Sequence, residues 1–333
     1  MKKQLRKLTS PREFNVIMLG SRRVGKTSLL TAMYHQYQRA IAKTAIELFP
    51  DPRTKETLEE KLKELQNLNE TEVIYGEGEE GIPPTESPGT PDLIRSYIFD
   101  VKRKARKETP IRLHFWDYPG DYIEQESDDE RYQSLKQRMM LSVVIIIVID
   151  ASALMEKKGK YFQDKTRAIQ SIFEKVYRDV KINRLVMFAP VKCEKYMKNP
   201  EMKQKLIDAI KNQYEELLLF LKKDEQSIVI ITPVQTVGTI CFSYIEKEEE
   251  YPVFRWKKQD PDQEYSPEDN DQPLKYILRF VLKLYLEDKQ RNILTNLACS
   301  YQYIKNSIKV FSQDCKTKDG FEIIQNEKLL NLK

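Results

Sequence analysis

Glycine, lysine and threonine recur near the start of the chain in a spacing that suits a phosphate chain. Gly20 and Gly25 enclose four residues and are followed directly by Lys26 and Thr27, which satisfies the pattern G-x-x-x-x-G-K-[ST]. Glycine lets the backbone curl so that successive N–H groups point inward at phosphate oxygens. We expect Lys26 to reach the β- and γ-phosphates of a nucleotide and the Thr27 hydroxyl to bind Mg²⁺. The predicted phosphate-binding residues are Gly20, Ser21, Arg22, Arg23, Val24, Gly25, Lys26, Thr27 and Ser28.

A second motif, Asp117-Tyr-Pro-Gly120, follows another apolar segment. A carboxylate at Asp117 can hold a water on a metal ion, and the backbone N–H of Gly120 can approach a γ-phosphate without side-chain obstruction. D-x-x-G at the end of a strand is the arrangement of switch GTPases, whose loops become ordered around the γ-phosphate and Mg²⁺. We therefore predict that Asp117 and Gly120 act with the glycine-rich loop.

The elements that must position these motifs are indicated by apolar periodicity. Continuous Val- and Ile-rich runs separated by helical patterns are typical of a parallel sheet covered by helices on both faces. Strands buried on both faces are predicted at residues 16–19, 143–149, 185–189 and 228–231, strands nearer an edge at 96–101 and 111–116, and helices at 27–42 and 166–180. The predicted fold is α/β, a three-layer sandwich with a mostly parallel sheet.

Several segments exceed a minimal nucleotide-binding domain. Residues 55–69 carry leucines at helical spacing, and residues 76–91 are predicted to form a flexible loop. Residues 242–246 and 251–256 are expected to pair as a hairpin, and the acidic, proline-punctuated stretch 260–271 is expected to be mobile. Helices are predicted at 274–286 and 293–311, and the apolar stripe of the second is expected to pack on the sheet. The predicted organisation is a basic arm at 1–11, a domain at 12–286 with insertions at about 43–91 and 242–272, and a helical extension at 287–333.

With both motifs in place, the sequence resembles the P-loop GTPases of the translation-factor-related, Ras-like class over about residues 12–286. A narrower resemblance, carried by Asp117-Tyr-Pro-Gly120 and the long insertion before it, is to large bacterial GTPases with a D-Y-P-G motif, including the double-GTPase-like proteins of bacterial conflict systems. The resemblance implies a P-loop NTPase fold with a helical insertion in the switch I region, and GTP or GDP with Mg²⁺ as ligands.

The segment that reads the base departs from the pattern of this class. Where switch GTPases carry [NT]-K-x-D, this chain has Val191-Lys192-Cys193-Glu194. Lys192 can lie along a purine face, and Glu194 offers the two carboxylate oxygens that guanine needs. An ordinary surface lysine and glutamate would give the same match. Residues 232–238 stand where the last base-contacting loop of the class falls, without its usual Ser-Ala-Lys pattern.

A metal-binding threonine is expected in the loop before residue 96, with Thr90 as first choice and Thr85 as alternative. For hydrolysis, Asp121 stands where small switch GTPases place the glutamine that orients the attacking water. Arg22 and Arg23 either compensate its charge in cis or point to solvent, and hydrolysis without a partner is expected to be slow.

Composition narrows the remaining classes of function. The net charge of +5 from 56 basic and 51 acidic side chains is too small to indicate a nucleic-acid partner. Four dispersed cysteines and two histidines make a zinc site, a disulfide framework or a histidine-based triad improbable and favour a reducing cytoplasm. The longest apolar run is far shorter than the roughly 20 residues that span a bilayer.

The predicted function is a Mg²⁺-dependent GTPase that acts as a nucleotide-controlled switch for a partner protein, through its switch loops or its C-terminal helix. Two alternatives stay open. Val191 and Glu194 allow an ATPase or a purine-nonselective P-loop protein. A pseudo-GTPase scaffold that holds nucleotide structurally is the third possibility.

Overall fold

The structure is a computed structural model of the whole chain. It describes residues 11–21, 24–40, 44–68, 73–75, 94–104, 110–124, 129–156, 160–178, 180–245, 254–258, 262, 264–292 and 301–332.

The chain alternates strands and helices. The strands are β1 (Arg12–Leu19), β2 (Ile46–Pro50), β3 (Val73–Tyr75), β4 (Arg95–Arg103), β5 (Ile111–Asp117), β6 (Ser142–Asp150), β7 (Arg184–Val191), β8 (Ser227–Ile231), β9 (Ile240–Ile245), β10 (Phe254–Lys258) and β11 (Glu322–Gln325). The α-helices are α2 (Lys26–Ala40), α3 (Pro52–Leu68), α4 (Glu130–Leu141), α5 (Ala151–Met155), α6 (Lys160–Tyr177), α7 (Pro200–Gln213), α8 (Glu215–Lys222), α9 (Asp271–Asn292) and α10 (Gln302–Asp314). Short 3₁₀ turns are η2 (Gly120–Glu124), η3 (Glu194–Met197) and η5 (Glu327–Leu330).

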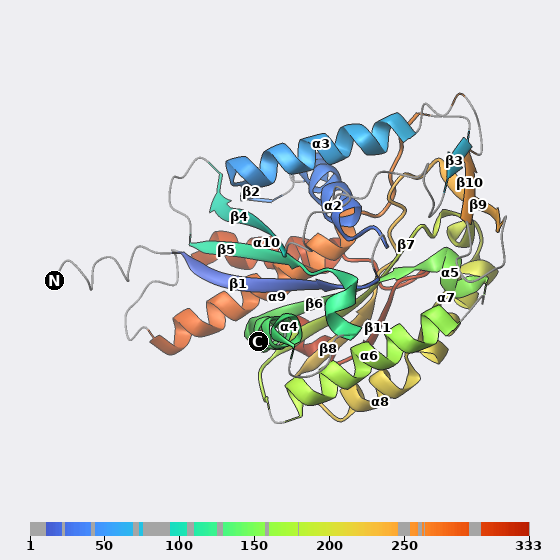
Figure 1. Cartoon of the computed structure of the whole chain (residues 1–333). Helices are drawn as coiled ribbons and strands as arrows, with labels where there is room; N and C mark the ends of the chain where they lie inside the picture. The colour runs from blue at the N-terminus through green and yellow to red at the C-terminus, as the bar shows by residue number, and fades with distance from the viewer. Residues whose placement is uncertain are drawn as a thin grey trace.

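Among the described residues, eight strands form the central sheet in the order β11-β8-β7-β6-β1-β5-β4-β2 (Figure 1). The five strands from β8 to β5 run parallel, while β4, β2 and β11 are antiparallel to their neighbours. Each strand predicted from an apolar run is confirmed. The edge strands β2 and β11 were not predicted, because each is short and neither has a continuous apolar run.

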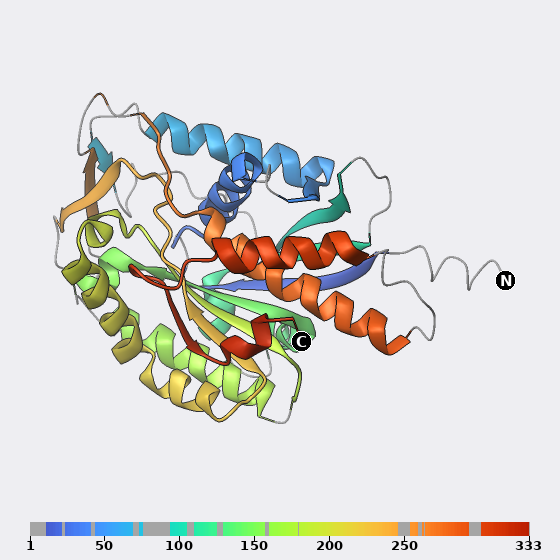
Figure 2. The ribbon, with the colours of Figure 1, turned by 180° about the vertical axis from the view of Figure 1, so that it is seen from behind.

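Two layers of helices cover the sheet because alternate residues of each strand point to opposite faces. On one face, Val16 and Met18 of β1 join a core with α2, α9 and α10. On the other, Ile17 and Leu19 join a core with α4, α6, α7 and α8. Seen from behind, α9 and α10 lie side by side (Figure 2). The predicted three-layer α/β sandwich is therefore confirmed.

The last part of the chain is tied into the sheet rather than extending from it. Ile304, Ile308 and Phe311 of α10 are buried in the core, as the predicted stripe required. Strand β11 then pairs antiparallel with β8, and the Gln325 side-chain amide donates to the carbonyls of Leu221 and Ser227 at 2.9 and 2.8 Å. The expected C-terminal helix is present, and it is followed by a strand that completes one sheet edge.

The predicted hairpin is also confirmed, since β9 and β10 pair antiparallel, and β3 from the earlier insertion adds a third strand. The mobile stretch expected at 260–271 is wrong for its later residues. Gln235 and Glu268 exchange backbone hydrogen bonds at 3.2 and 3.1 Å, and Asn270 is fully buried. The acidic side chains of this stretch do not prevent its backbone from pairing with the loop after β8.

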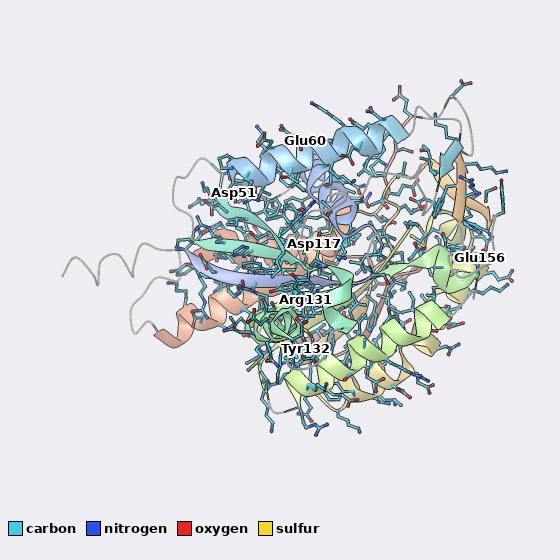
Figure 3. The ribbon with its side chains drawn as sticks, viewed as in Figure 1. Asp51, Glu60, Asp117, Arg131, Tyr132 and Glu156 are labelled. Carbon is cyan, nitrogen blue, oxygen red and sulfur yellow. The ribbon has the colours of Figure 1, made fainter. Side chains whose placement is uncertain are left out.

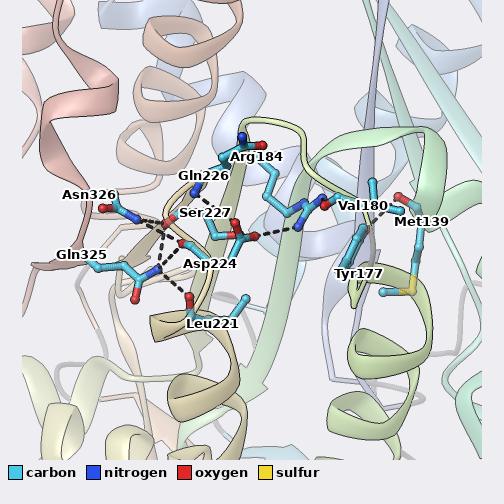
Figure 4. Close-up of polar contacts among 10 residues, drawn as sticks. All are labelled: Met139, Tyr177, Val180, Arg184, Leu221, Asp224, Gln226, Ser227, Gln325 and Asn326. Carbon is cyan, nitrogen blue, oxygen red and sulfur yellow. Dashed lines mark hydrogen bonds and ion pairs between the residues drawn. The ribbon is translucent and has the colours of Figure 1, made fainter.

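An ion pair between Arg184 and Asp224 lies at the start of β7, at the edge of the sheet opposite the carboxyl ends of the parallel strands (Figure 4). Arg184 is fully buried, and its Nη1 lies 2.9 Å from Oδ2 of Asp224. Its Nη2 donates to the carbonyl of Val180 at 3.0 Å, and the guanidinium lies 3.9 Å from the ring centre of Tyr177. Desolvation at this position lowers the pKa of Arg184. Asp224 is 23% exposed and also accepts from the Ser227 hydroxyl, so Arg184 is the member whose buried charge requires the pair.

We predict that Arg184→Ala lowers the free energy of unfolding by about 3 kcal/mol or more, because it breaks the ion pair and also removes the contacts of the buried guanidinium with Val180 and Tyr177. Arg112→Ala is the matched control, because Arg112 also pairs with an aspartate, Asp100, but its side chain is 34% exposed. The control should cost less than about 1 kcal/mol. Urea midpoints followed by circular dichroism measure both changes, and equal losses in the two variants would contradict the prediction.

Candidate functional site

Both predicted motifs lie at one edge of the central sheet. Because β1, β5, β6 and β7 are parallel, their carboxyl ends meet there, and the antiparallel strand β4 begins there. β5 pairs with one edge of β1 and β6 with the other, so the strand order of the sheet reverses at β1. In open α/β sheets this reversal creates the crevice in which ligands bind. Asp117 marks this point near the middle of the molecule (Figure 3).

The glycines of the loop between β1 and α2 are required by its backbone. Gly20 has φ +152°, and a Cβ atom there would lie 2.6 Å from the carbonyl oxygen of Val148 on β6. Gly25 has φ +106°, a conformation that residues with a side chain rarely adopt. A Cβ atom at Gly25 would lie 3.9 Å from Val191, so the loop also borders the end of β7. The backbone conformations that call for glycine are therefore present at Gly20 and Gly25.

Lys26 is buried beneath this loop. Its Nζ donates to the carbonyls of Gly20 and Ser21, both at 3.2 Å, and lies 3.8 Å from Oδ1 of Asp117. The ammonium is thus held between the loop and the end of β5, where it can meet phosphate oxygens.

Thr27 and Asp117 are in direct contact. The Thr27 hydroxyl donates to Oδ2 of Asp117 at 2.9 Å, and both side chains are buried. Burial raises the pKa of Asp117, while Lys26, Thr27 and Arg95 act in the opposite direction. A hydroxyl and a carboxylate this close are oxygen ligands of the kind Mg²⁺ takes, together with phosphate and water. Among the described residues, no three His, Cys, Asp or Glu side chains cluster as a metal cage.

Arg95 and Tyr97, two residues of β4 that the motifs do not contain, border the same point. Arg95 is the cross-strand partner of Asp117. The Tyr97 hydroxyl is buried near Thr27 and Arg95 without a hydrogen bond of normal geometry. Burial and the charge of Asp117 raise the pKa of Tyr97. Only the pairing of β4 with β5 shows that these two residues lie at the site, because the spacing of residues within a motif does not give the register between strands.

After Asp117 the chain turns into η2, which Gly120 begins. Tyr118 is buried against Tyr122, with ring centres 5.7 Å apart. Asp121 lies in this turn, and its side chain is outside the described part of the structure, as are Arg22, Arg23, Thr85 and Thr90 as whole residues. Their predicted roles in hydrolysis and metal binding stay predictions.

On the face of the sheet that α4 covers, two aromatic rings of β5 stack beside this turn. The Trp116 ring lies 4.0 Å from that of His114 and 3.5 Å from the Arg138 guanidinium of α4. The Trp116 Nε1 donates to Oδ1 of Asn15 at 2.9 Å. Burial and Arg138 lower the pKa of His114. The residue directly before Asp117 is thus packed against the helix that follows the turn.

The structure also brings the predicted base-reading residues to this edge. Lys192 has φ +56°, and such left-handed conformations in residues other than glycine often mark functional sites. Its Nζ lies 2.6 Å from Oδ2 of Asp150, at the end of β6, and 5.0 Å from the ring centre of Trp256 on β10. Asp150 and Trp256 were not predicted to take part, because a single acidic residue and a single tryptophan form no motif.

Glu194 joins the two predicted base loops. Its Oε1 accepts from the backbone N–H groups of Val237 and Gly238 at 3.2 and 3.4 Å. The side chain is only 4% exposed, and burial raises its pKa despite these bonds. Gly238 has φ +80°, and a Cβ atom there would collide with the carbonyl of Ser266. One carboxylate oxygen of Glu194 is therefore already hydrogen-bonded to the protein's own backbone.

The fold and the site define a P-loop nucleotide-binding protein: a glycine loop between the first strand and helix, its lysine, and a Thr–Asp pair. The model of the Double-GTPase 2 family matches residues 16–232, and the chain belongs to this family. No match was found among curated proteins.

Solved structures of low sequence identity show a limited likeness. The GTP-bound Ski7 GTPase-like domain of S. cerevisiae has a TM-score of 0.40 and 13% identity, covering 70% of this chain and 45% of that one. The GTP-bound SRb/SRX complex of Chaetomium thermophilum has a TM-score of 0.34 and 15% identity, covering 68% of this chain and 91% of that one. The GDP-bound SAR1-type protein of Encephalitozoon cuniculi has a TM-score of 0.32 and 10% identity, covering 70% of this chain and 74% of that one. The family match, rather than these structures, identifies the chain.

None of the helices in the described part of the chain combines the length and apolar character that crossing a bilayer requires.

We predict that the effect of Asp117→Asn on the stability of the nucleotide-free protein becomes more favourable as the pH rises. A carboxyl group whose pKa is raised on folding favours the folded state while it is protonated, and this contribution is lost as the pH rises through the folded pKa. Asparagine does not titrate, so the difference in unfolding free energy, variant minus wild type, should grow from pH 4.5 to pH 8. Urea titrations across this range measure it, and a constant difference would contradict the raised pKa.

Proposed function

We propose that the protein binds GTP with Mg²⁺, hydrolyses it, and acts as a nucleotide-controlled switch for a partner protein. The observation that carries this proposal is the meeting of Lys26, Thr27 and Asp117 at the carboxyl end of the parallel strands. Membership of a GTPase family supports GTP as the nucleotide.

Each residue has a separate task in this proposal. The backbone amides of residues 20–25 and the start of α2 bind the phosphate chain, and Lys26 adds a charge at the β- and γ-phosphates. Thr27 and Asp117 would hold the metal ion. The chemistry that a bound Mg²⁺ supplies is neutralisation of charge on the phosphate oxygens.

Hydrolysis transfers the terminal phosphoryl group to water. A bond forms between the water oxygen and the γ-phosphorus as the bond to the β–γ bridging oxygen breaks, the electron pair stays on GDP, and the water proton passes to the released phosphate. Asp121 is proposed to orient this water. The switch is proposed to lie in η2, because Asp117 and Gly120 pass directly into it and Trp116 links the end of β5 to α4. The stripe of α10 is buried and is not proposed as the partner surface.

Binding without base selectivity is the second candidate, and one observation favours it. Oε1 of Glu194 already accepts two backbone N–H bonds, and Lys192 reaches toward Asp150 and Trp256. Guanine recognition through Glu194 then depends on its second carboxylate oxygen.

We predict that Lys26→Ala weakens GTP binding about 10- to 100-fold, the loss expected for one hydrogen bond to a charged group, worth about 1.5–3 kcal/mol. Isothermal titration calorimetry of the purified protein measures the change, and EDTA should weaken binding to the wild type. Lys205→Ala is the control, since Lys205 forms an exposed pair with Glu201 on α7 and is far from the loop in sequence. Unchanged affinity in Lys26→Ala would refute the proposed site.

We predict that Glu194→Gln lowers the preference for GTP over ATP about tenfold or more. Oε1 of Glu194 accepts from two backbone N–H groups, so a glutamine would keep its single acceptor oxygen there and turn its NH₂ donor toward the N–H groups of guanine. Competition titrations with GTP and ATP measure the ratio of dissociation constants. A ratio near one in the wild type, or the same ratio in both proteins, would favour binding without base selectivity.

A further inference from the structure

Arg95 is a cation at the candidate site that belongs to neither motif. It is the first residue of β4 and is paired with Asp117 in the antiparallel register between β4 and β5. On β4, Tyr97 and Phe99 face the core beneath α2, and on β5 the residue Phe115 does the same. Side chains two residues apart share a face, so Arg95 and Asp117 both point to the side on which α2 begins.

This pairing places Arg95 within reach of the proposed phosphate site. Directly opposed residues of an antiparallel pair have Cβ atoms about 4.5–5.5 Å apart. Arg95 accordingly acts to lower the pKa of Asp117 and that of Tyr97, in each case against the larger effect of burial. Its guanidinium therefore lies near the Thr27–Asp117 contact.

The two cations approach Asp117 from opposite sides. Strand β5 lies between β1 and β4, so Lys26 comes from the loop that follows β1 and Arg95 from the start of β4. The Lys26 ammonium lies 3.8 Å from the Asp117 carboxylate and donates hydrogen bonds to two carbonyls of the loop. One carboxylate flanked by two cations gives the site an excess of positive charge, which suits a ligand with several negative charges.

A second feature points into the same space. The Tyr97 hydroxyl is buried on the same face of β4, close to Thr27, and has no hydrogen bond of normal geometry. Buried hydroxyl groups usually have a partner. A phosphate oxygen or a metal-bound water next to Thr27 would provide one.

We propose that Arg95 binds the terminal phosphate of GTP and stabilises the charge that develops there during hydrolysis. The guanidinium exchanges its interaction with Asp117 for one with the γ-phosphate oxygens as the bond between phosphorus and the bridging oxygen breaks and the electron pair passes to GDP. An arginine in this role stabilises transition-state charge without taking or giving a proton. The inference rests on the proposed function. It gives Arg95 on β4 the compensating positive charge that the sequence analysis suggested for Arg22 or Arg23.

Arg112 offers a matched control on the same pair of strands. It is the register partner of Asp100, and its Nε lies 2.8 Å from Oδ1 of that residue. The pair is thus another arginine–aspartate register pair of β4 and β5, but an odd offset along each strand places it on the opposite face of the sheet, away from α2. Asp100 lies five residues after Arg95 on β4, and Arg112 lies five residues before Asp117 on β5, away from the loop.

The test compares the wild type, Arg95→Ala, Arg95→Lys and Arg112→Ala in calorimetric titrations with Mg²⁺-GTP and Mg²⁺-GDP and in single-turnover hydrolysis. In Arg95→Ala we expect the ratio of GTP to GDP affinity, the hydrolysis rate, or both to fall at least about tenfold, with GDP affinity changed less than about threefold. Arg95→Lys should recover part of the loss, since it keeps the charge but not the planar fork. Arg112→Ala should match the wild type.

The two proposals fail in distinguishable ways. A wild type that binds neither nucleotide refutes the proposed function and the role of Arg95 with it. A wild type that binds GTP, with an unchanged affinity ratio and rate in Arg95→Ala, refutes only the role of Arg95. Equal losses for GTP and GDP also refute it, because they would show that Arg95 serves the folded site through Asp117.

Discussion

The contact between the Thr27 hydroxyl and the Asp117 carboxylate sets the constraint on which the site depends. These residues are 90 positions apart, and they meet only because β1 and β5 are parallel neighbours that end at the same edge. Burying the carboxylate there is costly, as its raised pKa indicates, and Lys26 offsets part of the cost. The central sheet therefore holds a buried carboxylate at the edge where the proposed phosphate site lies.

Much of this arrangement could be predicted from the sequence because it depends on local signals. The loop from Gly20 to Thr27 follows from glycine conformation and from the strand and helix on either side. The buried parallel strands follow from continuous runs of Val and Ile, since such runs have no polar face to present to water. The hairpin of β9 and β10 was likewise predicted from two neighbouring segments of the sequence.

Other parts could not be predicted because they depend on contacts between distant segments. Arg95 reaches the site through the register of β4 against β5, which no motif encodes. Glu194 fits a base-reading pattern, yet its oxygen binds the amide groups of a loop more than forty residues later. Strand β11 has too few apolar residues to be recognised, and its place is fixed by β8 and by the Gln325 side chain.

The chain contains two tryptophans, and they lie at the two ends of the proposed nucleotide site. Trp116 precedes Asp117 at the phosphate end, and Trp256 lies beside Lys192 at the base end. Because an indole's emission responds to nearby charge and to solvent, each ring is a built-in optical reporter. Replacing one by phenylalanine would leave a single emitter, so that events at the phosphates and at the base could be followed separately and in real time.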